Sequence, residues 1–131
     1  MGTFSVTVEL GDPAGTRFES FEALVDTGAS YTWVPVSLLA RLGVAPTRRF
    51  PFTFADGRRV ERDMGETKIR FGALEQTTWV VFGDEGTQPL LGAYSLEGFG
   101  LAVDPLNRGL LPMTGWLAVT SWLDRARSRP R

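Results

Sequence analysis

The stretch Ala23-Leu24-Val25-Asp26-Thr27-Gly28-Ala29-Ser30 determines how the rest of this 131-residue chain is interpreted. Its three leading apolar residues predict a strand buried on both faces, and Asp26 follows where that strand ends. Asp-Thr-Gly is common turn chemistry when it stands alone. A carboxylate beside a buried strand loses hydration at a cost in free energy, however, so its position indicates a functional role as well as a turn.

Short strands and tight turns surround this stretch. Apolar and polar residues alternate over residues 3–10, turn-forming residues fill 11–15, and residues 18–25 are expected to return as the second strand of a hairpin. Asp56-Gly57 predicts another hairpin turn, because glycine adopts a positive φ at little cost. The remaining predicted elements are strands over residues 48–54, 58–64, 66–71, 76–82, 101–104 and 110–113, and helices over 36–42 and 93–97, the second ended by Gly98. This pattern is typical of one all-β domain with two short helices.

A weak internal repeat indicates the same architecture. The apolar run of residues 23–25 leads through a glycine turn to the first helix, and Pro89-Leu90-Leu91-Gly92 leads in the same order to the second. Two copies are too few for a solenoid. We therefore expect two halves of one closed β domain over residues 1–113. Residues 114–131 follow as a tail, in which helical spacing and alternating arginines predict a helix with a basic end.

The composition limits the chemistry open to this chain. It contains no histidine and no cysteine, which excludes a Ser-His-Asp triad, a thiol nucleophile and metal sites built on imidazole or thiolate. Carboxylates are then the first candidates for proton transfer near neutral pH. We expect no metal and no cofactor, and a net charge of −1 gives no reason to expect nucleic acid as a partner. The sequence shows neither a signal peptide nor an apolar run of about 18 residues, so we expect a cytoplasmic protein without a membrane partner.

In this order and spacing, the motifs resemble the retropepsin-like aspartic proteases, in particular the single-domain bacterial and retroviral members. The resemblance covers about residues 4–112. It rests on residues 24–30, on the hairpin over 54–60 at the position of the family's flap, on residues 89–92, and on residues 101–104 with the hairpin that follows them. The resemblance implies a closed acid-protease β-barrel with two short helices, one domain per chain and an active site at the interface of a homodimer.

The number of Asp-Thr-Gly motifs also leads to the homodimer. Peptide hydrolysis without histidine, cysteine or metal needs a base that activates water and an acid that protonates the leaving amine. Two adjacent carboxylates that share one proton supply both, yet the chain contains a single Asp-Thr-Gly. A twofold axis would bring Asp26 next to its copy. We therefore predict an aspartic endopeptidase acting on peptide or protein substrates. The alternative is a non-catalytic module with this fold, used for dimerisation or peptide binding.

The resemblance also implies roles for individual residues. Asp26, Thr27 and Gly28 form the catalytic turn, in which the Thr27 hydroxyl bonds across the dimer beneath the two carboxylates. Substrate contacts are expected from Ala29, Ser30, Phe54, Ala55, Asp56, Gly57, Arg58 and Leu91. For five large side chains, two positions remain possible, either packed in the core or lining a substrate pocket. They are Trp33, Phe54, Trp79, Phe82 and Leu91. The chain departs from the retroviral pattern at Ser30 and Ala93, where those members carry an acidic residue and an arginine.

Overall fold

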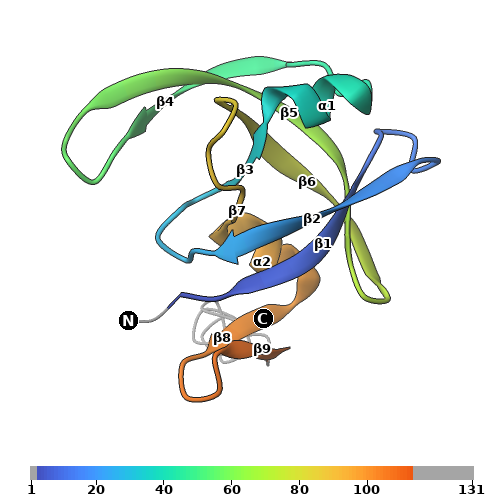
Figure 1. The fold of residues 1–131 in the computed structure, drawn as a ribbon, viewed down its shortest axis with the longest axis vertical. Helices are drawn as coiled ribbons and strands as arrows, with labels where there is room; N and C mark the ends of the chain where they lie inside the picture. The colour runs from blue at the N-terminus through green and yellow to red at the C-terminus, as the bar shows by residue number, and fades with distance from the viewer. Residues whose placement is uncertain (1–2, 114–131) are drawn as a thin grey trace, which may run out of the picture.

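The computed structural model describes residues 3–113, which form a strongly curved sheet with two short helices (Figure 1). The strands are β1 (Ser5–Gly11), β2 (Phe18–Val25), β3 (Thr32–Pro35), β4 (Arg48–Thr53), β5 (Arg59–Phe71), β6 (Leu74–Gly83), β7 (Leu90–Leu91), β8 (Leu101–Asp104) and β9 (Gly109–Pro112). The helices are α1 (Val36–Arg41) and α2 (Ala93–Phe99). These elements confirm the prediction of a mainly β domain with two short helices.

The first hairpin follows from the alternating pattern of the sequence. β1 and β2 pair antiparallel, in register from Ser5↔Leu24 to Gly11↔Phe18. Because successive side chains of a strand face opposite sides, Val8 and Leu10 enter the core together, with exposures of 1% and 0%. The predicted hairpin is therefore confirmed, and its second strand ends at Val25, directly before Asp26.

Seven strands form the main sheet, in the order β1-β2-β7-β3-β6-β5-β4. The two-residue strand β7 lies between β2, to which it is parallel, and β3, to which it is antiparallel. β1 pairs a second time with β5, at Glu9↔Arg70 and Leu10↔Ile69, so the pairings lead back to the first strand. β8 and β9 form a separate two-stranded sheet.

The core lies within the curve of the sheet and continues under both helices. α1 packs against β3 and β6, and α2 packs against β3, β6 and β8. The buried side chains are almost all aliphatic: Val8, Leu10, Ala23, Val25, Val34, Leu38, Leu39, Leu42, Val44, Ile69, Val80, Leu91, Leu96, Phe99 and Leu101. This core holds the end of β2 and the whole of β7 in place, and both strands lead into the segment around Asp26.

The sequence indicated that Gly65 separates two strands, but in the structure it lies inside one strand. Residues 58–64 and 66–71 were predicted as separate strands, but β5 runs through both without interruption for 13 residues. A Cβ atom on Gly65 would lie 2.6 Å from the carbonyl oxygen of Ala45. The glycine is therefore explained by the close approach of another backbone segment and not by a turn.

The end of α2 and the strand β3 also differ from the sequence prediction. α2 continues past Gly98 to Phe99, and Gly100 ends it with a φ of 74° and a ψ of 35°. The Gln76 amide occupies the space where a Cβ atom on Gly98 would be. β3 was not predicted from the sequence, and the predicted tail helix over residues 114–131 lies outside the described residues. Among residues 3–113, no helix is long and apolar enough to cross a membrane.

Asp12 organises the turn between β1 and β2. Its carboxylate accepts hydrogen bonds from the N–H groups of Thr16 and Arg17, at 2.7 and 2.9 Å, and from the Thr16 hydroxyl at 2.7 Å. These bonds favour the charged carboxylate, the Arg17 bond most of all, and lower the pKa of Asp12 from 3.8 to about 2. The ionised Asp12 carboxylate therefore stabilises the folded chain fully above its ordinary pKa of 3.8. This contribution is lost as the pH falls through the lowered pKa of about 2.

We predict that Asp12→Asn lowers the melting temperature above pH 3.8, and that the difference from the wild type shrinks as the pH falls towards about 2. The amide keeps an oxygen that accepts hydrogen bonds from the turn but carries no charge. Thermal unfolding followed by circular dichroism across this pH range measures the difference. A difference that stays constant with pH would contradict a lowered pKa at Asp12.

Candidate active site

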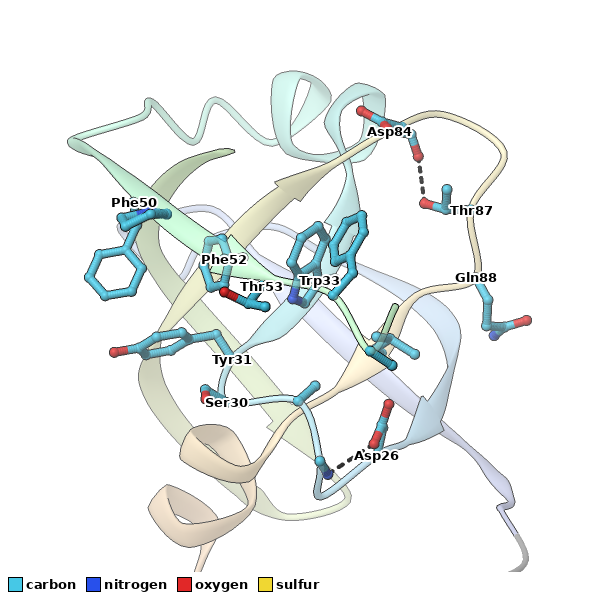
Figure 2. Close-up of a pocket in the computed structure, with 16 residues that line it drawn as sticks. Asp26, Ser30, Tyr31, Trp33, Phe50, Phe52, Thr53, Asp84, Thr87 and Gln88 are labelled. Atoms are coloured by element: carbon cyan, nitrogen blue, oxygen red, sulfur yellow. Dashed lines mark hydrogen bonds between the residues drawn. The ribbon is translucent and has the colours of Figure 1, made fainter. Parts of the chain in front are cut away.

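Asp26 lies at the end of β2, where β7 runs beside it. The Asp26 N–H donates to the Leu91 carbonyl at 3.0 Å, and the Ala29 N–H donates to the Asp26 carbonyl at 3.1 Å. The N–H of Gly28 donates to the Asp26 carboxylate at 2.9 Å, a bond drawn in Figure 2. The turn thus fixes the side chain as well as the backbone of Asp26, because the Gly28 N–H holds one of the two carboxylate oxygens.

The start of α2 holds the other end of the same turn. The N–H groups of Ala93 and Tyr94 donate to the carbonyls of Ala29 and Ser30, at 2.8 and 2.9 Å. This contact requires a glycine before the helix, since a Cβ on Gly92 would lie 2.5 Å from the carbonyl carbon of Tyr31 and 2.9 Å from the carbonyl oxygen of Ala29. Gly92 therefore lets two backbone segments meet at a distance that no other residue allows.

Three buried hydroxyl groups lie beneath this contact. The Ser95 hydroxyl is 2.7 Å from that of Thr32 on β3 and 2.8 Å from that of Thr78 on β6. The Thr32 hydroxyl also accepts from the N–H of Gly92 at 3.1 Å. With exposures of 0% or 1%, these hydroxyls have no access to bulk water. The network therefore ties α2, β3 and β6 to the segment that carries the turn.

A cavity of about 650 Å³ opens beside Asp26. Its wall includes four residues of the turn (Asp26, Gly28, Ala29 and Ser30) and five aromatic residues (Tyr31, Trp33, Phe50, Phe52 and Phe54). Asp84, Thr87 and Gln88 lie along the loop between β6 and β7 on one side of the groove, as Figure 2 shows, and Pro51, Thr53, Ala55 and Leu90 complete the lining. A groove of this size with apolar walls and few polar groups is typical of a ligand site.

The aromatic wall forms because β4 folds over the segment that follows the turn. Phe50, Phe52 and Phe54 alternate with other residues, so one face of the hairpin carries all three. The Trp33 ring centroid lies 5.2 Å from that of Phe52 and 6.0 Å from that of Phe54, and the Tyr31 ring lies 6.1 Å from Phe50. These contacts connect β4, the edge strand of the sheet, directly to the groove floor.

The Asp56 and Arg58 side chains form an ion pair at the tip of the β4–β5 hairpin. The Asp56 carboxylate accepts from the Arg58 N–H at 3.0 Å and from the Arg58 guanidinium at 2.8 Å, and these bonds lower the pKa of Asp56 below its ordinary value. The guanidinium also lies over the Phe54 ring, 5.0 Å from its centroid. Gly57 has a φ of 90°, which the predicted Asp-Gly turn requires. The charge of Arg58 is therefore matched within the tip.

The structure brings together most, though not all, of the residues expected at the site. Ala29, Ser30, Phe54 and Ala55 line the groove with Asp26 and Gly28, whereas Asp56, Gly57 and Arg58 belong to the hairpin tip outside its lining. Leu91 is fully buried in the core, and Leu90 lines the groove instead, because neighbouring residues of a strand face opposite sides. Of the large side chains left open between core and pocket, Trp33 and Phe54 line the groove, while Trp79 and Phe82 do not.

Thr27 does not line the groove but lines a second cavity of about 370 Å³. Its remaining lining residues are Thr3, Phe4, Val25, Asp26, Gly28 and Val103. The two cavities thus meet at the Asp26 turn. Within the part of the chain that the structure describes, no group of three or more acidic side chains could hold a metal ion.

Tyr31, Phe50, Phe52 and the rim residues Asp84, Thr87 and Gln88 were not predicted for the site. The alternation of phenylalanines at residues 50, 52 and 54 was visible in the sequence. It indicates a strand with one aromatic face, but only the folded hairpin shows that this face lines the same groove as Asp26.

Comparison with known proteins agrees with this geometry. A family model described as "gag-polyprotein putative aspartyl protease" matches residues 17–98, a span that runs from β2 through the Asp26 turn and the β4–β5 hairpin into α2. The chain belongs to this family. These retropepsin-like aspartic proteases are the family that the sequence motifs resembled, so that prediction is confirmed. No curated protein matches the sequence.

The fold resembles that of a solved viral protease. The solution structure of the simian foamy virus (mac) protease has a TM-score of 0.51 and 18% identity, with 72% of this chain and 92% of that chain covered. A retropepsin-like aspartic protease from Rickettsia conorii has a TM-score of 0.47 and 23% identity, with 79% and 86% covered. The foamy virus enzyme shows that the likeness extends over most of both chains.

We predict that Ser95→Ala lowers the free energy of unfolding by about 1–3 kcal/mol, because the Thr78 hydroxyl is left buried without its partner. Urea denaturation followed by tryptophan fluorescence measures the change. Ser20→Ala serves as the control, since Ser20 is exposed on β2, and it should have little effect. Equal effects of the two substitutions would contradict a role for the buried network.

We also predict that Gly92→Ala displaces the Asp26 turn and costs about 1–3 kcal/mol or more, because the new methyl group overlaps backbone atoms of Tyr31 and Ala29. Denaturation gives the stability, and the amide chemical shift of Gly28 reports the position of the turn. Gly109→Ala is the matched control, since its Cβ would meet nothing nearer than 4.0 Å. An unchanged Gly28 shift in a folded Gly92→Ala variant would contradict the close contact.

Proposed function

We propose that the chain is an aspartic endopeptidase that acts as a homodimer, with Asp26 paired with its copy in a second chain. The observation that supports this most directly is the position of Asp26. Asp26 lines a groove about 650 Å³ in volume, and the Gly28 N–H orients its carboxylate. Membership of the aspartic protease family adds to that argument.

The second carboxylate of the reaction is assigned to another copy and not to this chain. Asp84 also lines the groove, but it lies at the far end from Asp26 in Figure 2. Its carboxylate is 3.0 Å from the Arg62 guanidinium, and its side chain is 68% exposed. An ion-paired carboxylate at the opposite end of the groove cannot share a proton with Asp26. An isologous dimer, by contrast, places two identical turns at the axis.

Paired carboxylates explain hydrolysis without further groups. One carboxylate of the pair is ionised and removes a proton from water as the water oxygen bonds to the scissile carbonyl carbon. The other is protonated and donates to the carbonyl oxygen, because two adjacent like charges do not both ionise. When the carbon–nitrogen bond breaks, the protonated carboxyl group donates its proton to the leaving amine, and the ionised carboxylate takes a proton from a hydroxyl of the tetrahedral intermediate, which restores the pair to its starting state. Such a pair titrates as a unit.

The β4–β5 hairpin is the flap in this proposal. β4 is the edge strand of the main sheet, so its outer edge is available for backbone hydrogen bonds to an extended peptide. The aromatic face of β4 already covers the groove next to Asp26. The second pairing of β1, with β5, supports the closed barrel that the resemblance implies. The substrate is accordingly a peptide segment in extended conformation.

We predict that Asp26→Asn lowers the rate of peptide cleavage by at least about a hundredfold while the dimer remains, because the amide neither removes nor supplies the proton. Cleavage of a mixed peptide library is followed by mass spectrometry at a concentration where sedimentation shows a dimer. Glu66→Gln, an exposed carboxylate on β5, is the matched control and should retain full activity.

Two outcomes would contradict the proposal. Cleavage at the same rate by the wild type and Asp26→Asn would exclude Asp26 as the catalytic group. A wild-type chain that stays monomeric at every concentration would exclude the homodimeric site.

A further inference from the structure

A second cavity adjoins Asp26 and is lined mostly by residues that do not line the groove. It has a volume of about 370 Å³ and shares Asp26 and Gly28 with the groove. Its apolar wall consists of Phe4, Val25 and Val103, with Thr27 at the rim. If the proposed function holds, a second copy must approach Asp26 on a side that the groove does not occupy. The cavity therefore lies where that copy would make contact.

The turn between β8 and β9 stands next to this cavity and is built to be rigid. The Asp104 carboxylate accepts from the N–H groups of Leu106 and Asn107, at 3.0 and 3.3 Å, and from the Asn107 amide at 2.8 Å. The Arg108 guanidinium donates to the carbonyl of Thr3 at 2.6 Å. The turn is thereby attached to the N-terminal segment that lines the cavity.

This rigid turn exposes a large apolar side chain. Leu106 is 91% exposed, whereas the other exposed large apolar residues of the described chain are between 37% and 45% exposed. A leucine held in water by a fixed turn gives no stability to its own chain. It is well suited to binding, because little conformational freedom is lost when such a side chain enters a pocket. Apolar anchors of this kind carry much of the energy of protein interfaces.

We propose that Leu106 of each copy inserts into the cavity beside Asp26 of the other copy. Because a twofold interface repeats every contact, one dimer contains two such insertions. The cavity offers apolar walls for the leucine, and the Arg108 bond keeps the turn beside the cavity of its own chain while Leu106 points into solvent. The inference rests on the proposed function and names the surface through which the two halves of the site assemble.

Sedimentation of the full chain tests this assignment. Leu106→Asp should raise the dimer dissociation constant by at least about a hundredfold, because a charge replaces an apolar anchor at two symmetric places. The melting temperature of the monomer should not change, since the side chain is exposed in its own chain. Leu74→Asp is the matched control, a leucine 41% exposed at the start of β6, and should leave the dissociation constant unchanged.

The outcomes separate this inference from the proposed function. If the wild type dimerises and cleaves peptides but Leu106→Asp has the wild-type dissociation constant, the insertion is wrong and the proposed function stands. If Leu106→Asp lowers the melting temperature and leaves the dissociation constant unchanged, Leu106 stabilises the fold of its own chain, which also overturns the insertion. If the wild type forms no dimer, both proposals fail.

Disulfide trapping gives a direct measurement, because the chain has no cysteine of its own. Chains carrying Leu106→Cys are mixed with chains carrying Thr3→Cys, one of the two being isotopically labelled, and oxidised mildly. The insertion predicts a disulfide between the two kinds of chain, identified by mass. Disulfides between two Leu106→Cys chains alone would show that the two tips meet at the axis, which overturns the insertion.

Discussion

The backbone of Gly92 lies against the carbonyl groups of Ala29 and Tyr31, and the geometry of the site depends on this contact. Because no side chain separates the two segments, the N–H groups at the start of α2 reach the carbonyls that follow the Asp26 turn. β7, immediately before Gly92, supplies the Leu91 carbonyl that accepts from the Asp26 N–H. The segment from Leu91 to Tyr94, which is distant in the sequence, thus holds both ends of the turn in which the Gly28 N–H orients the carboxylate.

The parts of the molecule that could be predicted are those determined by residues close together in the sequence. Alternation over residues 3–10 specified which side chains of β1 enter the core, and turn residues specified where the hairpin closes. Asp26 was identified because a carboxylate after a buried strand is costly without a purpose. The run Pro89–Gly92 was recognised by resemblance alone, and the structure gives it a physical meaning, since it carries the carbonyl and the glycine that position the turn.

The parts that escaped prediction depend on contacts between distant residues. β3 is four residues long and pairs in parallel with β6, in register from Thr32↔Val80 to Pro35↔Gly83, a partnership that no local pattern reveals. Gly65 and Gly98 had the appearance of breaks, whereas each makes room for another residue. Likewise, only the folded sheet distinguishes Leu90, which lines the groove, from Leu91, which is buried.

The continuity of β5 has a mechanical consequence for the hairpin above the groove. From Met64 to Phe71 this strand pairs with β6, and from Arg59 to Met64 it pairs with β4. Between its tip and Met64 the hairpin is therefore a two-stranded ribbon joined to the body at one end, as Figure 1 shows. The Ala45 carbonyl lies against the backbone of Gly65 and the Thr47 N–H donates to the Met64 carbonyl at 2.8 Å, so the ribbon is anchored to the body at residues 64 and 65. Bending of the ribbon away from the groove would separate the aromatic rings of β4 from Tyr31 and Trp33, so these contacts set the free energy that opening requires.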